Sequence, residues 1–443
     1  MAIEIGAKNL YKAYGIPALD ITFANKKSLV DRISGNNLIT FTRASTATYV
    51  GADGLIKSAA VNEPRFDHNP TTGESLGLLV EEARTNQITY SNAQANSSGW
   101  FFDGNKGGLN GAGGKNYFVV TSNTTETLAP DGTFTATKLT APATILNSTA
   151  TPGITEFSYP LHLVSQISTT GNPLTCSFYV KDPSNFANGL NKIGIMSGGF
   201  FNPAKQYGTF DLVNKQTSSA NATITAFPNG WYRLTFTVTE GGVFGFNAWN
   251  GLTSPLYIWG AQCEAGSFPT SYIPTTTATV TRAADVASMT GTNFSSWYNQ
   301  SQGTFSANLL PIEPANDGVA TGGAVFLDLQ GDGFILQSRV GSSYAIRTND
   351  PSGFNFEAIS TVNGKINFSI GLSSDGSTSI SRGSSPAVVN MSIGTLPKTG
   401  LLIGSGNRGG TWGASRTGSC VFSRLTYYPV RLPDAQLQTL TAT

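Results

Sequence analysis

The segment at residues 229–240, NGWYRLTFTVTE, restricts the fold most, because its apolar and polar residues alternate as they do along a β-strand. One face carries a tryptophan, an arginine and two threonines. The other face, which we expect to meet a core, carries Tyr232, Leu234, Phe236 and Val238. Strand patterns at residues 174–182 and 254–266, with turn signals between such segments, predict an antiparallel β-sandwich of jelly-roll type.

The composition fits an all-β protein and excludes several other classes. Charged residues make up 12% of the chain, about half the usual share, while aromatic residues reach 11% and glycines number 50. A net charge of +1 with this aromatic content is not the composition of a disordered chain. It also provides no electrostatic attraction to nucleic acid or to an anionic membrane.

Strand patterns divide the 443 residues into three expected regions. Residues 1–90 are expected to form an N-terminal region with short strands, including a hairpin that turns at residues 51–54. Residues 91–285 should form the jelly roll, and residues 286–443 a second sandwich. The sequence thus predicts an all-β fold of tandem antiparallel β-sandwiches preceded by an N-terminal region.

Three shorter segments need separate interpretation. Residues 63–75, with two prolines, are expected to be a polar loop, and residues 77–86 fit either a strand or a short helix. Residues 432–443 form the best helix candidate, because Asp434 suits a helix N-terminus and Leu437 and Leu440 are three residues apart.

Signals for export and for redox chemistry are weak. The chain does not begin with a basic segment followed by an apolar run, so we expect no signal peptide, and no apolar stretch is long enough for a transmembrane helix. Cys176, Cys263 and Cys420 are far apart and odd in number, which favours three buried apolar residues over a disulfide framework or a zinc site. Reduced thiols suit a protein made in a cytoplasm.

Signatures of catalysis are missing, and we expect neither an enzyme nor a cofactor. The two histidines, His68 and His162, are expected in loops or at the surface, and no nucleophile elbow, zinc-protease motif or P-loop occurs. Two carboxylates suffice for a glycoside hydrolase, but the adjacent Glu81 and Glu82 would point to opposite faces of a strand. Carboxylates are therefore expected at the surface or in turns.

A metal site has only weak support. In FLDLQGDGF, residues 326–334, Asp328 and Asp332 stand beside glycines, and oxygen ligands on a turn can hold calcium. A plain hairpin turn explains the same residues and is the favoured interpretation.

Candidate glycan-binding residues are aromatic side chains beside glycine-rich segments, since sugar faces pack on aromatic rings. The segments at residues 100–117 and 241–250 provide them, although a core role is open for each. The candidates are Trp100, Phe102, Tyr117, Phe246 and Trp249.

One weak internal similarity links two distant segments. TFTRASTATYV at residues 40–50 and TVTRAADVASM at residues 279–289 share the order of threonines, arginine and alanine. Each segment would lead the chain into a new sandwich, and chance explains the similarity equally well.

Longer segments carry a resemblance to a known class of proteins. Residues 40–86 resemble a segment of tailed-bacteriophage fibre and head-spike proteins. PDGTFTATKL, NGWYRLTFTV and YIWGAQCEAGSFPTSYIPT are similar to the carbohydrate-binding-module-like jelly roll of the same proteins, and residues 420–440 resemble the end of a concanavalin- or laminin-G-like sandwich. Residues 1–18 lie outside the resemblance.

The resemblance implies a virion surface protein made in the host cytoplasm. It implies attachment to capsid or tail proteins through the N-terminal region, assembly into a homo-oligomer, commonly a trimer, and binding of host surface polysaccharide by the sandwiches. Nucleic-acid binding and membrane insertion are not expected. A head fibre, knob or cement (decoration) protein with a structural role is the alternative, and a polysaccharide-degrading tailspike is a minor one.

Overall fold

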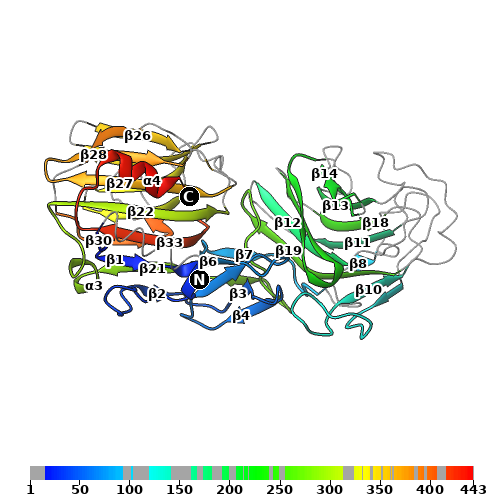
Figure 1. The fold of residues 1–443 in the computed structure, drawn as a ribbon. Coiled ribbons are helices and arrows are strands. Elements are labelled where there is room, and N and C mark those ends of the chain that lie inside the picture. The colour runs from blue at the N-terminus through cyan, green and yellow to red at the C-terminus, as the bar shows by residue number, and fades with distance from the viewer. Residues whose placement is uncertain are drawn as a thin grey trace.

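The protein has two lobes built almost entirely of antiparallel strands in the computed structural model (Figure 1). The structure describes residues 15–92, 101–102, 119–140, 161–166, 173–181, 192–198, 206–212, 214–217, 219–238, 243–248, 255–312, 324–331, 333–339, 343–350, 353–359, 361, 364–383, 388–393, 397–406 and 416–442. The predicted all-β class with tandem sandwiches is confirmed.

Two large sheets form the lobe that contains the C-terminus. The first has the order β29-β28-β27-β22-β33-β6-β5, with β1 also paired to β33. Its strands are β1 (Leu19–Ile21), β5 (Arg65–His68), β6 (Ser75–Val80), β22 (Gln302–Pro311), β27 (Ile366–Ser373), β28 (Ser377–Arg382), β29 (Val389–Ser392) and β33 (Cys420–Tyr428). The second has the order β2-β21-β30-β23-β24-β25-β26. Its strands are β2 (Thr40–Thr42), β21 (Val286–Thr290), β23 (Val325–Gln330), β24 (Phe334–Arg339), β25 (Ser343–Asp350), β26 (Gly353–Ile359) and β30 (Gly400–Ile403).

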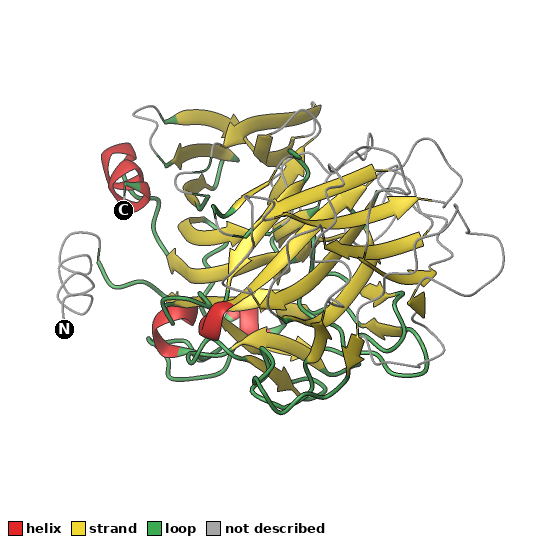
Figure 2. Ribbon diagram, turned by 90° about the vertical axis from the view of Figure 1, so that its right-hand side faces the viewer, coloured by secondary structure: helices red, strands yellow, loops and turns green. Residues whose placement is uncertain are grey.

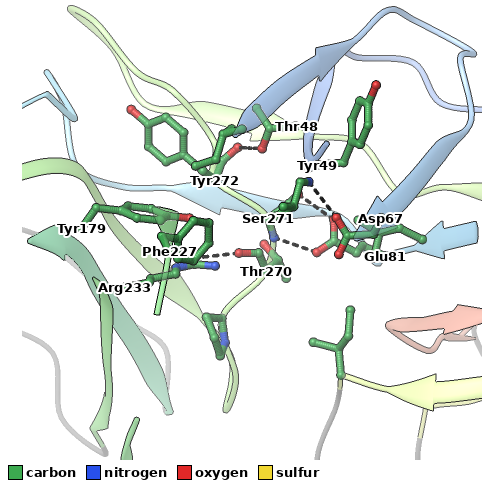
Figure 3. Close-up of a pocket in the computed structure, with 15 residues that line it drawn as sticks. Thr48, Tyr49, Asp67, Glu81, Tyr179, Phe227, Arg233, Thr270, Ser271 and Tyr272 are labelled. Carbon is green, nitrogen blue, oxygen red and sulfur yellow. Dashed lines mark hydrogen bonds between the residues drawn. The ribbon is translucent and has the colours of Figure 1, made fainter. Parts of the chain in front are cut away.

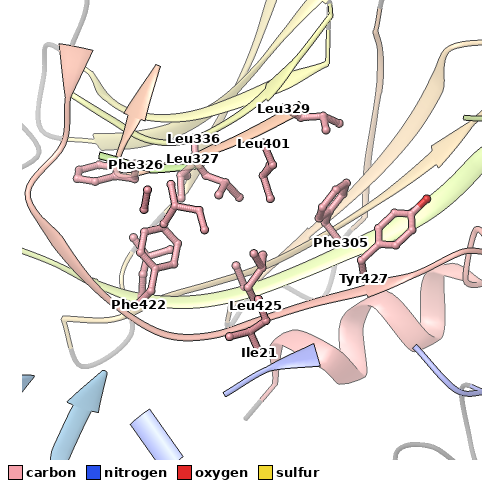
Figure 4. Close-up of a cluster of buried hydrophobic side chains, with 14 of the residues drawn as sticks. Ile21, Phe305, Phe326, Leu327, Leu329, Leu336, Leu401, Phe422, Leu425 and Tyr427 are labelled. Atoms are coloured by element: carbon pink, nitrogen blue, oxygen red, sulfur yellow. The ribbon is translucent and has the colours of Figure 1, made fainter. Parts of the chain in front are cut away.

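These two sheets enclose a large apolar core (Figure 4). Phe305 on β22 and Tyr427 on β33 contact each other at a ring-centroid distance of 4.7 Å. Leu327, Leu336 and Leu401 from the opposite sheet are fully buried against this layer. Each strand places alternate side chains on one face, so two such faces fill the space between the sheets.

The first ninety residues contribute strands to both sheets of this lobe. Leu19 pairs with Tyr427, and Phe422 of the same strand β33 pairs with Leu78 of β6. On the second sheet, Phe41 of β2 pairs with Ala287 of β21. The sheets therefore cross the boundary expected near residue 90, because β1, β2 and β6 pair with strands of the last 160 or so residues, and β5 joins the first sheet by pairing with β6.

The other lobe is the central sandwich. One sheet has the order β16-β17-β12-β19-β10-β9 and the other β15-β14-β13-β18-β11-β8. The first sheet contains β9 (Val119–Thr121), β10 (Thr137–Thr140), β12 (Leu174–Lys181), β16 (Ala222–Ala226), β17 (Trp231–Val238) and β19 (Leu256–Ala265). The second contains β8 (Phe101–Phe102), β11 (Leu161–Gln166), β13 (Lys192–Gly198), β14 (Gln206–Asp211), β15 (Gln216–Thr217) and β18 (Val243–Ala248).

Strand β17 shows how the local pattern and the tertiary structure combine. Leu234, Phe236 and Val238 lie in the core between the sheets, as the alternation predicted. The opposite face is also covered, because Trp231 is 1% exposed and packs in a second apolar cluster with Ile56. Ile56 belongs to β4 (Ile56–Ala59), which forms the predicted hairpin with β3 (Ala47–Val50). The hairpin of the N-terminal region therefore covers the outer face of the central sandwich.

The remaining elements are small and lie beside the strand layers (Figure 2). They are α2 (Phe23–Lys26), α3 (Thr292–Ser295), α4 (Asp434–Thr441), the 3₁₀ turn η2 (Pro228–Gly230), the pair β7 (Arg84–Asn86) and β20 (Val280–Arg282), and the pair β31 (Ser405–Gly406) and β32 (Arg416–Thr417). The predicted C-terminal helix is confirmed as α4, which buries Leu437 against Leu432 and Tyr428. No helix in the described part of the chain is long and apolar enough to cross a membrane.

Two local predictions need correction or completion. The expected polar loop at residues 63–75 contains strand β5, whose polar side chains are buried by partners from distant segments. The undecided segment at residues 77–86 is extended and contributes β6 and β7. All three cysteines are buried, as predicted.

Candidate ligand pocket and buried ion network at the junction

A network of buried charges lies where the N-terminal segments meet the chain that links the two sandwiches. Its members are the guanidinium groups of Arg43, Arg65 and Arg282 and the carboxylates of Glu81 and Asp285, all at most 1% exposed. Each of these residues stands at or next to a strand end: β2, β5, β20, β6 and β21. The expected surface or turn placement is therefore wrong for Glu81 and Asp285.

Arg65 is the centre of the network. Its Nη1 lies 2.7 Å from Oε2 of Glu81 and donates to the carbonyl oxygen of Thr48 at 2.8 Å, while its Nη2 pairs with Asp285. Ser271 adds two hydrogen bonds of 2.7 Å to the Glu81 carboxylate, one from its backbone N–H and one from its hydroxyl. Buried charges are tolerated only with such paired and hydrogen-bonded geometry.

Arg43 and Arg282 complete the network from the two similar segments identified in the sequence. Arg43 Nη1 lies 3.0 Å from Oδ1 of Asp285. Arg282 Nη1 lies 3.5 Å from Oε2 of Glu81, and its Nη2 donates to the carbonyl oxygen of Glu82 at 2.7 Å. The two arginines at equivalent places in those segments thus share one network.

The pKa of Glu81 reflects these neighbours. Burial by itself acts to raise this pKa, but Arg282, Arg65 and the hydrogen bonds from Ser271 outweigh it and lower the pKa to about 2. Burial also lowers the pKa of Arg282, against the opposing effect of Glu81. The carboxylate is therefore ionised in the folded protein, and its role is structural.

Beside this network lies a pocket of about 230 Å³ between the N-terminal region and the central sandwich (Figure 3). Strands β3, β4, β5 and β6 provide one wall, and β12, β17 and residues 269–272 provide the other. Ligand pockets for drug-sized molecules usually measure about 300–1,000 Å³. This pocket therefore suits a group about the size of one sugar ring.

Aromatic side chains form much of the pocket lining. Tyr179 is the central ring, with its centroid 5.1 Å from that of Phe227 and 6.3 Å from that of Tyr272, both in edge-on geometry. Tyr49 on β3 is only partly buried and lines the pocket from the N-terminal side. The ring–ring contacts fix the orientation of the buried aromatic groups.

Two half-buried charged groups also line the pocket. Arg233 donates to Thr270 O at 2.8 Å and to Ser177 Oγ at 3.1 Å, and its guanidinium lies 5.5 Å from the centre of the Tyr179 ring. The Asp67 carboxylate accepts a 2.7 Å hydrogen bond from the Val50 backbone N–H. Burial raises the pKa of Asp67 to about 6, with the nearby negative Glu81 acting in the same direction.

This lining combines rings with a hydrogen-bond donor and an acceptor. Aromatic faces bind the C–H faces of sugars, and charged or polar side chains bind hydroxyl groups. At neutral pH Asp67 is an ionised acceptor, whereas Arg233 is a donor that can also pair with a carboxylate. The pocket therefore has the chemistry to hold a sugar or a sugar acid.

Neither of the two described residues among the predicted glycan-binding candidates lines this pocket. Trp100, Tyr117 and Trp249 lie outside the described residues. Phe102 is on β8 and Phe246 on β18, and both are register partners of Leu163 on β11, which lies between them in the sheet. Their role in glycan binding stays a prediction.

The remaining predicted site residues are placed as follows. Asp328 is on β23 and is buried, whereas Asp332 lies outside the described residues. No three His, Cys, Asp or Glu side chains gather as a metal site among the residues that the structure describes. His68 is a buried strand residue whose Nδ1 lies 3.0 Å from Val50 O, so its expected loop or surface placement is wrong. His162 is on strand β11 rather than in a loop, and its placement at the surface stays a prediction.

Sequence patterns gave no direct signal for the pocket residues. Tyr49, Asp67, Tyr179 and Arg233 come from four strands, and each fits a strand pattern without special spacing. The similar segments at residues 40–50 and 279–289 were the one usable signal, because their arginines meet in the adjoining network.

Comparisons with known proteins give structural likenesses only. No family model matches the chain, and no curated protein matches its sequence. The solved structures that match include the binding domain of Paraclostridial Mosquitocidal Protein 1, at 12% identity over 36% of this chain and 43% of that one, with a TM-score of 0.25. This chain thus spans less than half of that protein.

Two further matches are sugar-binding or laminin-type domains. The Ruminococcus gnavus IT-sialidase CBM40, solved with α2,3-sialyllactose, matches at 12% identity over 34% of this chain and 88% of its own, with a TM-score of 0.25. Domains LG4-5 of the mouse laminin α1 chain match at 11% identity over 61% of this chain and 91% of theirs, with a TM-score of 0.21. At these TM-scores the likenesses carry no argument about function.

Proposed function

We propose that this chain is a non-catalytic glycan-binding protein of a virion surface, and that the junction pocket receives one sugar residue of a host surface polysaccharide. The observation that carries the proposal is the lining of the pocket, which has a volume of about 230 Å³. The rings of Tyr49 and Tyr179 line it together with the charged side chains of Arg233 and Asp67. Rings with a few convergent polar groups are what sugar recognition requires.

The junction gives such a pocket a fixed shape. Arg65, Glu81 and Asp285 are held by several hydrogen bonds each, and Glu81 and Ser271 line the pocket themselves. A wall that is fixed before binding lowers the entropy cost of binding.

The virion location rests on the sequence resemblance at residues 40–86 and 257–275. In this proposal the N-terminal region attaches the chain to capsid or tail proteins, and copies of the chain assemble as a homo-oligomer, with a trimer as the expected form. Synthesis in the host cytoplasm agrees with three buried thiols.

The test is binding of the full-length chain to polysaccharides purified from candidate host cells, followed by titration calorimetry with the fragments that bind. Tyr49→Ala should weaken binding about tenfold, which is the loss expected for one ring–sugar contact. Phe134→Ala is the matched control, because Phe134 is 51% exposed and does not line the pocket.

Two other outcomes separate the alternatives. Loss of binding in Trp249→Ala with normal binding in Tyr49→Ala would move the site to the predicted aromatic residues of the central sandwich. No binding to any polysaccharide, with the chain retained on virions, would contradict glycan recognition and favour a head fibre, knob or cement protein.

A further inference from the structure

Two of the three cysteines stand face to face in the core of the central sandwich. Cys176 on β12 and Cys263 on β19 are directly opposite each other in the antiparallel register. Their Sγ atoms are 3.0 Å apart, and both residues are completely buried. The sequence placed them 87 positions apart and gave no reason to pair them.

The backbone holds this pair in a geometry that a disulfide can bridge. Directly opposed residues of antiparallel strands have Cα separations of about 4.5–5.5 Å, within the span of about 4.4–6.8 Å found for disulfides. The register continues on both sides, with Thr175 opposite Glu264 and Ser177 opposite Gln262. The sulfur atoms therefore need to approach by only about 1 Å to reach the S–S bond length of about 2.05 Å.

We propose that Cys176 and Cys263 form an oxidation site, at which a cross-strand disulfide closes when the protein passes from a reducing to an oxidising environment.

The oxidant is a low-molecular-weight disulfide. One cysteine thiolate attacks this disulfide and releases one small thiol, giving a mixed disulfide on the protein. The second cysteine thiolate then attacks the protein sulfur of the mixed disulfide and releases the other small thiol. Two protein thiols are oxidised and one small disulfide is reduced to two thiols, which balances the electrons and protons.

Burial determines when the reaction occurs. Both residues belong to the apolar core between the sheets, together with Phe178, Val180 and Phe236. Burial raises the pKa of the Cys176 thiol, and its contact with Cys263 acts in the same direction, so little thiolate is present in the closed core. Oxidation therefore follows transient opening of the strands, and it is slow in the native protein and fast under mildly destabilising conditions.

The bond would join the two central strands of the sheet and tie them to the junction. Cys263 accepts a hydrogen bond from the Gln87 N–H at 2.9 Å, and its own N–H donates to Asn86 Oδ1 at 3.1 Å. Closing a loop of this length restricts the unfolded chain and raises the midpoint of thermal unfolding, by about 5–10 °C for a lobe of this size.

The third cysteine provides an internal reference. Cys420 is on β33 in the other lobe, where its Sγ lies 3.6 Å from the carbonyl oxygen of Gly418. After treatment of the full chain with oxidised glutathione in mild denaturant and return to buffer, we expect alkylation under denaturing conditions to modify one cysteine per chain instead of three. Intact-mass measurement should show loss of two hydrogen atoms, and peptide mapping should link the peptides of Cys176 and Cys263.

Three variants make the test specific. Cys176→Ala and Cys263→Ala should each abolish the two-hydrogen loss, whereas Cys420→Ala should keep it and leave no alkylated cysteine. Three alkylated cysteines per chain after treatment, or stable glutathione adducts on both core cysteines, would overturn the proposal. A linked product whose thermal midpoint is lower than that of the reduced chain would show that the strands cannot accept the bond and would also contradict it.

Discussion

Arg43 and Asp285, which are 242 residues apart in the sequence, form an ion pair of 3.0 Å with both side chains completely buried. Arg43 directly follows β2, and Asp285 directly precedes β21, the strand that pairs with β2 in the second sheet of the C-terminal lobe. The pair therefore joins the point where the chain leaves β2 to the point where it enters β21. Around it, Arg65 and Glu81 extend the same network toward the pocket.

Loss of Asp285 should destabilise the protein strongly. Asp285→Ala leaves Arg43 and Arg65 buried without their shared carboxylate, and removal of one partner from a buried ion pair costs about 3–5 kcal/mol. Urea denaturation of the variant and the parent chain measures the difference. The control is Asp53→Ala, which breaks the exposed pair with Lys57 and should change the free energy of unfolding little. Equal effects of the two substitutions would contradict the structural role of the network.

Lowering the pH should reduce the free energy of unfolding through protonation of Glu81. Its pKa is about 2 in the folded protein against 4.5 for an ordinary glutamate, so the unfolded chain binds a proton first as the pH falls. The contribution of Glu81 is complete above pH 4.5 and is lost as the pH drops from about 4.5 to about 2. Denaturation at several pH values should show this slope, and Glu81→Gln should reduce it. Glu63→Gln, at an exposed carboxylate, should leave the slope as in the parent chain.

Through Asp67, the free energy of unfolding should change with pH in the opposite direction and over a different pH range. Because burial raises its pKa from 3.8 to about 6, the folded state keeps the proton after the unfolded state has lost it. The free energy of unfolding should therefore fall as the pH rises from about 4 to about 6. NMR titration of the Asp67 carboxyl carbon measures the pKa directly, and Asp67→Asn should remove this part of the pH dependence. A midpoint near 4 would show that the pocket does not shield this group.

Substitution of Gly77 in strand β6 should destabilise the protein. Its φ is 121°, and a Cβ atom there would lie 1.9 Å from the carbonyl oxygen of Phe422 on the neighbouring strand. Gly77→Ala should therefore lower the free energy of unfolding by more than about 1 kcal/mol, because the backbone of β33 cannot move aside cheaply. Gly35→Ala is matched in its positive φ of 74° but meets no atom within 4 Å, so thermal unfolding should show a smaller loss.

Deletion of the first ninety residues should unfold the C-terminal lobe. The deletion removes β1, β2, β5 and β6 from two sheets and exposes Leu425 and Ala287 to water. Circular dichroism and limited proteolysis of residues 91–443 should show a lobe that is not folded. A chain that lacks only residues 1–14, and so keeps all four strands, is the control. A stable lobe in the longer deletion would show that the N-terminal strands are accessory.

Local patterns predicted those elements whose apolar residues face a core directly. Strand patterns predicted β17 and β19, and the turn residues Gly51, Asp53 and Gly54 predicted the hairpin of β3 and β4. The C-terminal helix followed from the spacing of Leu437 and Leu440. In these segments the local preference and the tertiary position agree, so the sequence pattern is sufficient.

Strand β5 shows where this reasoning fails. Arg65 and His68 are charged or polar residues in a segment with flanking prolines, and a pattern analysis assigns such residues to the surface. They are buried because their partners arrive from distant segments, including Asp285 and Val50. No local pattern contains that information.

The sequence by itself determined that the chain folds as antiparallel sandwiches, because strand alternation and turn residues are local properties of the chain. Only the tertiary structure decided that the N-terminal strands belong to the C-terminal lobe, that Cys176 meets Cys263, and that Tyr49 and Arg233 line one pocket. The physical reason is that these contacts depend on which strands pair across long sequence separations. Strand pairing of that kind is fixed by the packing of the whole molecule rather than by any one segment.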